Sequence, residues 1–314
     1  MKNITVIGAG TMGHGIAEAF AIHGYKVNLF DLSKEALEKA IATTKEELII
    51  LASEDIIKLN EIDNIIGRII LCNDLKLAVK DADYVIESVL ERLDVKQGLF
   101  KQLDSLAPAK TIFASNTSSL KLSEMISEVS EDRKKNCIIN HWYNPSHIMP
   151  IAELTFFGET SQETYNKVEK LYTSIGKQIV KVLKEVDGLV ANRIQQAVAR
   201  EVFSLIEMEV ASPADIDRAL KFGPAFRYCS TGQLEIADFG GLDIWKIVGD
   251  NLLAVMDSTQ KANPLLKKKV DEGKLGIKSG EGFYKYDTPE AIKVAKEAYT
   301  IKLLKQLKIS KDYI

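Results

Sequence analysis

The N-terminal stretch that ends at Asp31 constrains the fold of this chain more than any other. An apolar run at 4–7 leads into the sequence Gly8-Ala9-Gly10-Thr11-Met12-Gly13, and an apolar, helix-like stretch follows at 16–22. A second apolar run at 25–30 stops at Asp31, about 20 residues beyond the glycines, where a dinucleotide-binding fingerprint has its acid. This order predicts an α/β chain that opens with a Rossmann-type, doubly wound sheet domain.

Each glycine of this pattern has its own physical role. Gly8 permits the tight turn, Gly10 lets a pyrophosphate approach the backbone, and Gly13 lets helix and strand pack closely. The free N–H groups and the dipole at the helix start favour phosphates. Asp31 would accept hydrogen bonds from both ribose hydroxyls and repel a 2′-phosphate, so we expect NAD rather than NADP. A lone glycine motif can be a mere flexible turn, but the flanking strands, the helix and Asp31 favour the nucleotide.

Composition and charge bound the class of protein. The 314 residues exceed one typical domain, and 46% of them are apolar, as in globular proteins with a sizeable core. A net charge of −3 gives no general attraction to nucleic acid or membrane, so we expect a small-molecule partner instead. The early strand pattern and the lack of an apolar run of ~18 residues predict neither signal peptide nor spanning helix. Three cysteines without metal or redox spacing indicate a cytoplasmic protein.

The rest of the chain divides into three predicted parts. Residues 1–187 form the sheet domain, 188–287 a helical domain, and 288–314 a helical tail with Leu303, Leu304 and Leu307 on one side. Further strands are predicted at 68–71, 84–89, 111–114, 137–139, 151–154 and 179–182.

An insertion interrupts the predicted sheet domain at about 34–66. Ser33 is the expected N-cap of a helix at 34–41, and a second helix is expected near 46–57. This is far longer than an ordinary connection, so it reads as an inserted helical hairpin. Such a hairpin could cover a long substrate or could be a structural addition.

Polar residues follow several predicted strands, where an open parallel sheet binds its ligands. Glu87 lies in the polar end of one predicted strand and Glu91 follows that strand, while Lys96 begins the next helix, where charged residues are commonly solvated. The five residues 115–119 are small and polar, so they could bind a carbonyl or a nicotinamide amide. Alternatively, Ser119 or Ser123 caps the next helix.

His141 comes directly after another predicted strand on the same side. Glu153 lies beyond Pro145 and Pro150, which force a turn, so the two side chains could meet across adjacent elements. A carboxylate on one imidazole nitrogen raises the basicity of the other, which suits proton removal from an alcohol. A lone histidine is also commonly structural. In the helical domain, Asn192 could be a cap, a hinge or a ligand.

Five ordered motifs together resemble the 3-hydroxyacyl-CoA dehydrogenase family over residues 1–287. They are the glycine motif, Ser115-Asn116-Thr117-Ser118-Ser119, His141-Trp142-Tyr143-Asn144-Pro145 with Glu153, Asp187-Gly188-Leu189-Val190-Ala191-Asn192-Arg193, and Gly280-Glu281-Gly282-Phe283-Tyr284. The resemblance implies an oxidoreductase of fatty acid metabolism with an NAD-binding domain and a helical domain that forms a homodimer. It also implies a cleft between them where NAD meets a short-chain 3-hydroxyacyl-CoA.

The resemblance also implies roles for individual residues. His141 corresponds to the general base and Glu153 to the carboxylate that orients it. Ser118 and Asn192 correspond to residues that hold the substrate near its carbonyl. The implied cofactor contacts are the glycine motif, Asp31, Glu91, Lys96, Ser118, Asn144 and Lys278. No metal is implied.

Two features depart from the commonest pattern of the family. Residues 223–228 and 232–235 resemble the branch of lambda-crystallin, L-gulonate 3-dehydrogenase and carnitine dehydrogenase, which act on free 3-hydroxy acids, and the tail extends past 287. There, Arg227 would grip a carboxylate by two hydrogen bonds. Residues 113–119 and 236–243, in contrast, resemble the acyl-CoA members. We therefore expect a 3-hydroxyacyl-CoA such as 3-hydroxybutyryl-CoA, with a free 3-hydroxy acid as the alternative and a non-catalytic NAD-binding protein as the third.

Overall fold

An eight-stranded sheet is the framework of Met1–Val190, the first of two units into which the chain divides; the second begins at Ala191. The structure is a computed structural model that describes residues 1–313. The sequence pattern predicts the domain boundary near Asp187, in the turn after the last strand.

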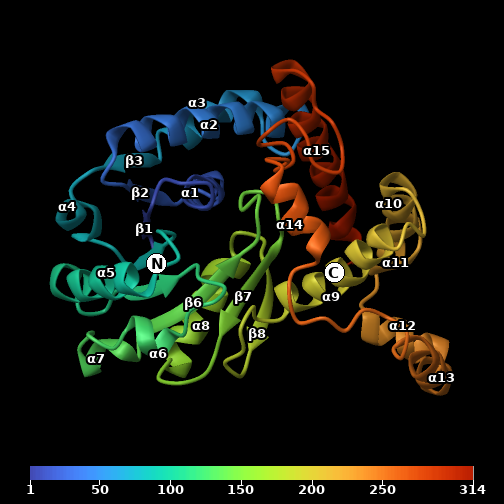
Figure 1. Ribbon diagram of the computed structural model, residues 1–314. Helices are drawn as coiled ribbons and strands as arrows, with labels where there is room; N and C mark the ends of the chain where they lie inside the picture. The colour runs from blue at the N-terminus through green and yellow to red at the C-terminus, as the bar shows by residue number, and fades with distance from the viewer. Residues whose placement is uncertain (314) are drawn as a thin grey trace. The chain divides into compact units, whose positions relative to one another are not determined.

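The sheet has the strand order β3-β2-β1-β4-β5-β6-β7-β8 (Figure 1). Its strands are β1 (Asn3–Ile7), β2 (Lys26–Phe30), β3 (Ile69–Cys72), β4 (Tyr84–Glu87), β5 (Ile112–Ser115), β6 (Cys137–Trp142), β7 (Ile151–Thr155) and β8 (Gln178–Val182). β1 to β6 are parallel, whereas β7 is antiparallel to β6 and parallel to β8. The strand order reverses beside β1, which confirms the predicted doubly wound sheet and marks the edge where such sheets bind ligands.

Helices cover both faces of this sheet. They are α1 (Gly13–Ile22), α2 (Lys34–Ser53), η1 (Leu59–Glu61), α3 (Ile62–Ile66), α4 (Leu75–Val79), α5 (Leu93–Leu106), α6 (Leu122–Met125), α7 (Glu131–Lys134) and α8 (Gln162–Thr173). Because successive side chains of a strand point to opposite faces, β1 contributes to two cores. Ile4 and Val6 pack in the core that contains Phe20 of α1, and Ile7 packs in the core that contains Phe100 of α5.

The insertion at 34–66 differs from its prediction. Ser33 does cap α2, since its hydroxyl accepts a 3.0 Å hydrogen bond from the N–H of Ala36. However, α2 is a single helix of 20 residues that passes through the expected break and ends at Ser53. The buried Thr44 lies at that break, so tertiary packing outweighs the modest helix propensity of the threonines there. The second helical segment comes later, as η1 and α3.

Two local predictions near the expected ligand edge are also wrong. β6 continues through Trp142, so His141 lies within the strand and not after it, because residues 139–142 keep pairing with neighbouring strands. The N-cap residue of α6 is Lys121, and its side chain makes no capping hydrogen bond. Neither Ser119 nor Ser123 therefore caps this helix.

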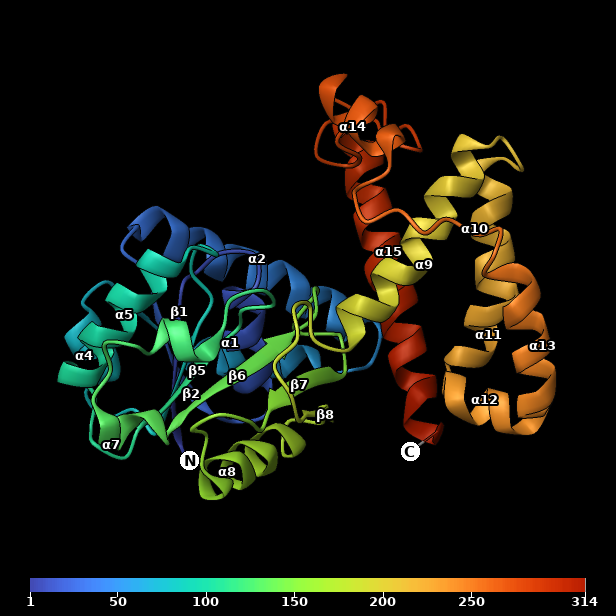
Figure 2. The ribbon, with the colours of Figure 1, turned by 60° about the horizontal axis from the view of Figure 1, so that its bottom comes forward.

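The second unit is helical, as predicted. Its helices are α9 (Ala191–Glu207), α10 (Pro213–Phe222), α11 (Pro224–Tyr228), α12 (Gln233–Gly240), α13 (Leu242–Leu252), α14 (Pro264–Asp271), α15 (Pro289–Ser310) and η2 (Lys311–Tyr313). α10 packs against α9 and α11, and α12 packs against α13 (Figure 2). The tail forms α15 and buries Leu304 completely. None of the helices in residues 1–313 has the length and apolar character that crossing a membrane requires.

Candidate active site

The glycine loop between β1 and α1 has the geometry that its sequence predicts. Gly8 has a φ of +97°, and a Cβ there would lie 2.6 Å from the carbonyl oxygen of Ser88. A Cβ on Gly13 would lie 1.7 Å from the carbonyl oxygen of Gly8. Only glycine therefore allows this turn and lets α1 begin so close to the strand.

The same loop leaves a place for a phosphate group. A Cβ added to Gly10 would meet no atom within 4 Å. The N–H groups of Gly10, Thr11 and Met12 donate to no other residue in the described range 1–313. Open space, unpaired N–H groups and the start of α1 together suit an anionic pyrophosphate, so the residues present fit a dinucleotide.

Asp31 follows the end of β2 and braces this loop. Its Oδ2 accepts a 2.8 Å hydrogen bond from the N–H of Ala9, and its Oδ1 accepts a 2.9 Å hydrogen bond from the N–H of Ser33. Each carboxylate oxygen can accept more than one hydrogen bond. Asp31 can therefore position the loop and still bind a ribose hydroxyl.

His141 on β6 and Glu153 on β7 form a buried pair. They are direct partners across the antiparallel ladder, and Nδ1 of His141 lies 2.8 Å from Oε2 of Glu153. Glu153 is fully buried, and its Oε1 accepts a 2.8 Å hydrogen bond from the N–H of Val190. A carboxylate beside Nδ1 keeps the proton on that nitrogen, so Nε2 is the nitrogen with a free lone pair. The pair can therefore act as a base toward a group that reaches Nε2.

Lys96 lies in a buried network of carboxylates. Its side chain is 1% exposed, and its Nζ lies 2.7 Å from Glu87 and 3.1 Å from Glu91. The expectation of a solvated lysine at the start of α5 is thus wrong, because two acids lie close to it. Glu91 also accepts hydrogen bonds from the hydroxyls of Thr117 and Ser119. Burial raises the pKa of Glu91, but the hydrogen bond from Thr117 and the charge of Lys96 together lower it below its ordinary value.

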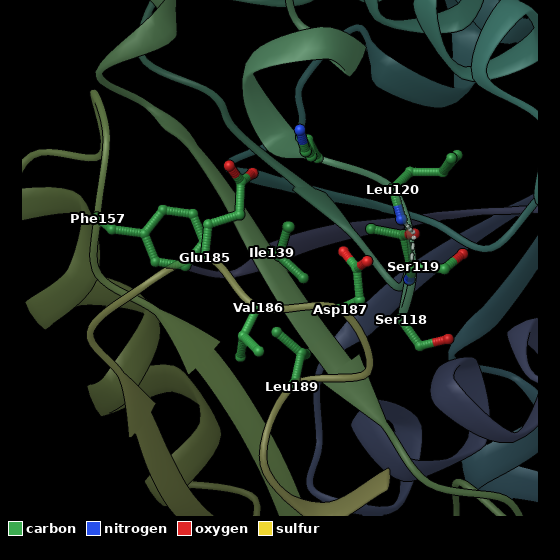
Figure 3. A pocket seen from close by; sticks show the side chains of 11 residues that line it. Ser118, Ser119, Leu120, Ile139, Phe157, Glu185, Val186, Asp187 and Leu189 are labelled. Atoms are coloured by element: carbon green, nitrogen blue, oxygen red, sulfur yellow. Dashed lines mark hydrogen bonds between the residues drawn. The ribbon is translucent and has the colours of Figure 1, made fainter. Parts of the chain in front are cut away.

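The loop after β5 is held on several sides. The N–H of Ser118 donates to Glu91 at 3.3 Å, and the carbonyl oxygen of Ser118 accepts a 3.0 Å hydrogen bond from Gly188. Asn116 accepts a 2.8 Å hydrogen bond from the N–H of Trp142, the neighbour of His141. Figure 3 shows Ser118 and Ser119 across a small pocket from residues 185–189. Its volume of about 10 Å³ has room for no more than a water molecule.

The remaining predicted residues are placed as follows. Asn144 is exposed in the segment after β6 and joins Pro145 by a cis peptide bond. Asn192, Arg227 and Lys278 all belong to the second unit. Asn192 lies in the first turn of α9, and Lys278 is exposed in the loop before α15. Arg227, on α11, lines a cavity of about 430 Å³ together with Phe226 and Phe239.

Glu87, at the end of β4, has contacts that the sequence pattern does not predict. It is fully buried at the end of β4, and Ser115, Lys96 and the N–H of Val89 all hydrogen-bond to its carboxylate. The sequence signal for this buried network is an acid inside an apolar strand pattern, because a buried carboxylate needs hydrogen-bond donors or a positive charge beside it.

The fold and this site define a nicotinamide-dependent dehydrogenase: a Rossmann-type domain, a loop suited to phosphates, an acid directly after the second strand and a buried histidine–carboxylate pair. Two family models match the chain, the NAD binding domain of 3-hydroxyacyl-CoA dehydrogenase over residues 3–186 and its C-terminal domain over 188–286. The chain belongs to the 3-hydroxyacyl-CoA dehydrogenase family. It is an oxidoreductase acting on a CH–OH group, and its cofactor is NAD.

The names of similar proteins indicate two classes of substrate, an acyl-CoA thioester and a pyridine carboxylate. A probable 3-hydroxybutyryl-CoA dehydrogenase of Bacillus subtilis (strain 168) is 36% identical over 288 residues, which are 91% of this chain and 98% of that protein. The 5-formyl-3-hydroxy-2-methylpyridine 4-carboxylate 5-dehydrogenase of Mesorhizobium japonicum is 33% identical over 304 residues, 97% of this chain and 96% of that protein. A solved structure of a 5-dehydrogenase for the corresponding 4-carboxylic acid, an NAD⁺ dependent dismutase, has a TM-score of 0.90 at 32% identity and covers 99% of both chains.

Proposed function

We propose that this protein interconverts a short-chain 3-hydroxyacyl-CoA, such as 3-hydroxybutyryl-CoA, and the 3-oxoacyl-CoA, with His141 as the general base. The observation that carries the proposal is the buried 2.8 Å contact between His141 Nδ1 and Glu153 Oε2. The similarity to a probable 3-hydroxybutyryl-CoA dehydrogenase over 91% of the chain supports the substrate class.

The chain's own residues handle the proton in this reaction. Nε2 of His141 takes the proton of the C3 hydroxyl as the alcohol becomes a carbonyl, and Glu153 stabilises the imidazolium that forms. The N–H of Val190 keeps Glu153 in place at 2.8 Å. When bound, NAD supplies the acceptor for the hydride that leaves C3. Reduction runs the same steps in reverse.

The binding residues follow from the same proposal. Residues 8–13 hold the pyrophosphate, and Asp31 holds the adenosine ribose. Glu91, Asn144 and Lys278 contact the cofactor, and Lys96 does so or acts through Glu91, whose carboxylate it pairs with at 3.1 Å. Ser118 and Asn192 bind the substrate near its carbonyl, with Ser118 also beside the cofactor.

The test measures oxidation of NADH by acetoacetyl-CoA with purified protein. We expect fast turnover, and His141→Asn should lower kcat by about two to four orders of magnitude while the affinity for NADH changes little. His23→Asn is the matched control, because His23 is an exposed histidine at the end of α1. Near-normal turnover of His141→Asn would remove His141 from the mechanism.

A free 3-hydroxy acid is the second candidate substrate, and two observations favour a substrate that carries a free carboxylate. Arg227 faces a cavity of about 430 Å³ with the apolar side chains of Phe226 and Phe239 around it. The relative named for a pyridine carboxylate matches 97% of the chain, and thus most of the tail after residue 287, whereas the acyl-CoA relative matches 91%. A guanidinium binds a carboxylate by two parallel hydrogen bonds, and a thioester offers it no charge.

Parallel assays separate the two substrates. NAD reduction is measured with 3-hydroxybutyrate, L-gulonate and carnitine, beside acetoacetyl-CoA reduction. If a free acid is the substrate, Arg227→Lys should raise its KM strongly because the fork geometry is lost. An unchanged KM in that variant would favour the thioester as the substrate. Binding of NADH with no turnover of any compound would identify a non-catalytic NAD-binding protein.

We also propose a homodimer that forms through the second unit. Large apolar side chains of α13 are exposed, including Leu242, Ile247 and Leu252, and exposed apolar patches commonly mark protein interfaces. Light scattering after gel filtration tests this, and a mass near 34.9 kDa would contradict it.

A further inference from the structure

Three side chains from separate elements meet on the α1 side of the sheet. Glu18 comes from α1, Glu47 from α2, and His147 from the segment between β6 and β7. One ligand atom of each lies within 4.8 Å of the other two. Nδ1 of His147 is 3.9 Å from Oε2 of Glu18 and 3.8 Å from Oε2 of Glu47. This cluster shares no residue with the nucleotide loop or with the His141–Glu153 pair.

The cluster is buried and leaves polar atoms without partners. The side chains of Glu18 and His147 are 0% and 3% exposed. Within residues 1–313, neither oxygen of Glu18 has a hydrogen-bond partner. Oε2 of Glu47 makes no hydrogen bond but lies 3.2 Å from Nε2 of His14, and Nδ1 is the nitrogen of His147 that faces the two carboxylates. A buried carboxylate without a partner is costly, and such groups commonly pair with a charge or coordinate a metal. The two buried carboxyls therefore either share a proton or take up a cation.

The spacing suits a cation between the ligands. Separations of 3.8 and 3.9 Å are too long for a hydrogen bond. Metal–ligand bonds of ~2.1 Å in tetrahedral geometry place two ligand atoms about 3.4 Å apart, so a small side-chain adjustment closes the site. Two carboxylates and an imidazole are zinc-type ligands, whereas Mg²⁺ and Ca²⁺ prefer oxygen alone.

We propose that Glu18, Glu47 and His147 bind a divalent transition-metal ion, with Zn²⁺ as the representative ion. Three protein ligands leave a fourth position for water. The side chain of Glu47 is 22% exposed, which gives the ion a route to the buried ligands.

The packing around the cluster holds its ligands in position. A Cβ on Gly15 would lie 2.5 Å from Oγ of Ser146 and 3.3 Å from Nδ1 of His147, so the glycine allows the histidine segment to approach α1. His14 contacts Glu47 through Nε2 at 3.2 Å and the carbonyl oxygen of Gly10 through Nδ1 at 2.9 Å. A bound ion would thus join α1, α2 and the segment that carries Asn144, and this role is structural.

Untagged protein, stripped with a chelator and dialysed, tests the proposal by calorimetric titration with ZnCl₂ and by thermal unfolding. We expect stoichiometric zinc binding and a higher Tm, because an ion that binds the folded state stabilises it. Zinc binding and the rise in Tm should both be lost in Glu18→Gln and His147→Gln. Both should be reduced in Glu47→Gln, because Glu47 is the more exposed ligand. His23→Gln, which changes an exposed histidine outside the cluster, should keep both. Circular dichroism establishes that each variant is folded.

Three results would overturn the proposal. Stripped wild-type protein that binds no zinc at millimolar concentration would identify the cluster as two carboxyls that share a proton. Zinc binding of unchanged affinity in folded Glu18→Gln and His147→Gln would place the ion elsewhere. Loss of zinc binding in His23→Gln would also place the ion outside this cluster.

Discussion

Nζ of Lys96 lies 2.7 Å from Oε1 of Glu87, and both side chains are buried. The lysine is in the first turn of α5, and the acid ends β4 at the ligand edge of the sheet. Their ion pair fixes the start of α5 beside this edge. Lys96 also pairs with Glu91, at 3.1 Å, so one lysine connects the two acids.

Replacing Lys96 by Met should lower the free energy of unfolding by about 3–5 kcal/mol, because Glu87 would remain as an uncompensated buried charge. Lys101→Met is the matched control. Lys101 pairs with Glu128 at the surface, where the two side chains are 65% and 49% exposed, so the expected loss is much smaller because solvent screens this pair. Urea unfolding measures both, and equal losses would contradict the buried-pair argument.

Glu153→Gln should lower kcat by about two orders of magnitude or more with little change in NADH affinity. The amide of glutamine can donate a hydrogen bond to Nδ1 of His141, which favours the wrong tautomer and removes the charge that stabilises the imidazolium. Steady-state assays and NADH fluorescence titration separate the two quantities. A normal kcat would mean that Glu153 serves only the β6–β7 ladder.

Asp31→Asn should weaken NAD binding and relax the discrimination against NADP. The substitution removes the charge that repels a 2′-phosphate and puts an amide N–H where Asp31 accepts from Ala9 or Ser33. The measurement is the ratio of kcat/KM for the two cofactors, with Asp81→Asn on an exposed loop as the control. Unchanged discrimination would count against Asp31 as the ribose acid.

Local patterns carry the parts of the structure that the sequence predicts well. The glycine loop, the strand that leads to Asp31 and the Ser33 cap depend on near neighbours, and the structure has all three. The contact of His141 with Glu153 was also predictable, because a short connection between two strands places nearby residues opposite one another. Their roles in catalysis stay predictions.

Long-range packing accounts for most of what the sequence does not predict. The length of α2 depends on tertiary burial of Thr44, and the burial of Lys96 depends on acids that β4 and its loop deliver. Glu18 and His147 are far apart in the sequence, and no spacing rule joins them. Such clusters become visible only when the sheet and its helices are assembled.

Asp104→Asn should lower stability at neutral pH but not in acid. Asp104 accepts hydrogen bonds from Ser130 and from Arg133, whose guanidinium is mostly buried. Partial burial raises the pKa of Asp104, but these hydrogen bonds outweigh it and lower the pKa below the ordinary 3.8. The carboxylate therefore stabilises the fold above pH 3.8, and this contribution is lost as pH falls through the lower folded-state pKa.

Urea unfolding from pH 7 to about pH 3 should show a difference from wild type of about 1–3 kcal/mol that shrinks toward the acid end. The exposed Asp132→Asn is the control, and a difference that stays constant with pH would contradict the assignment.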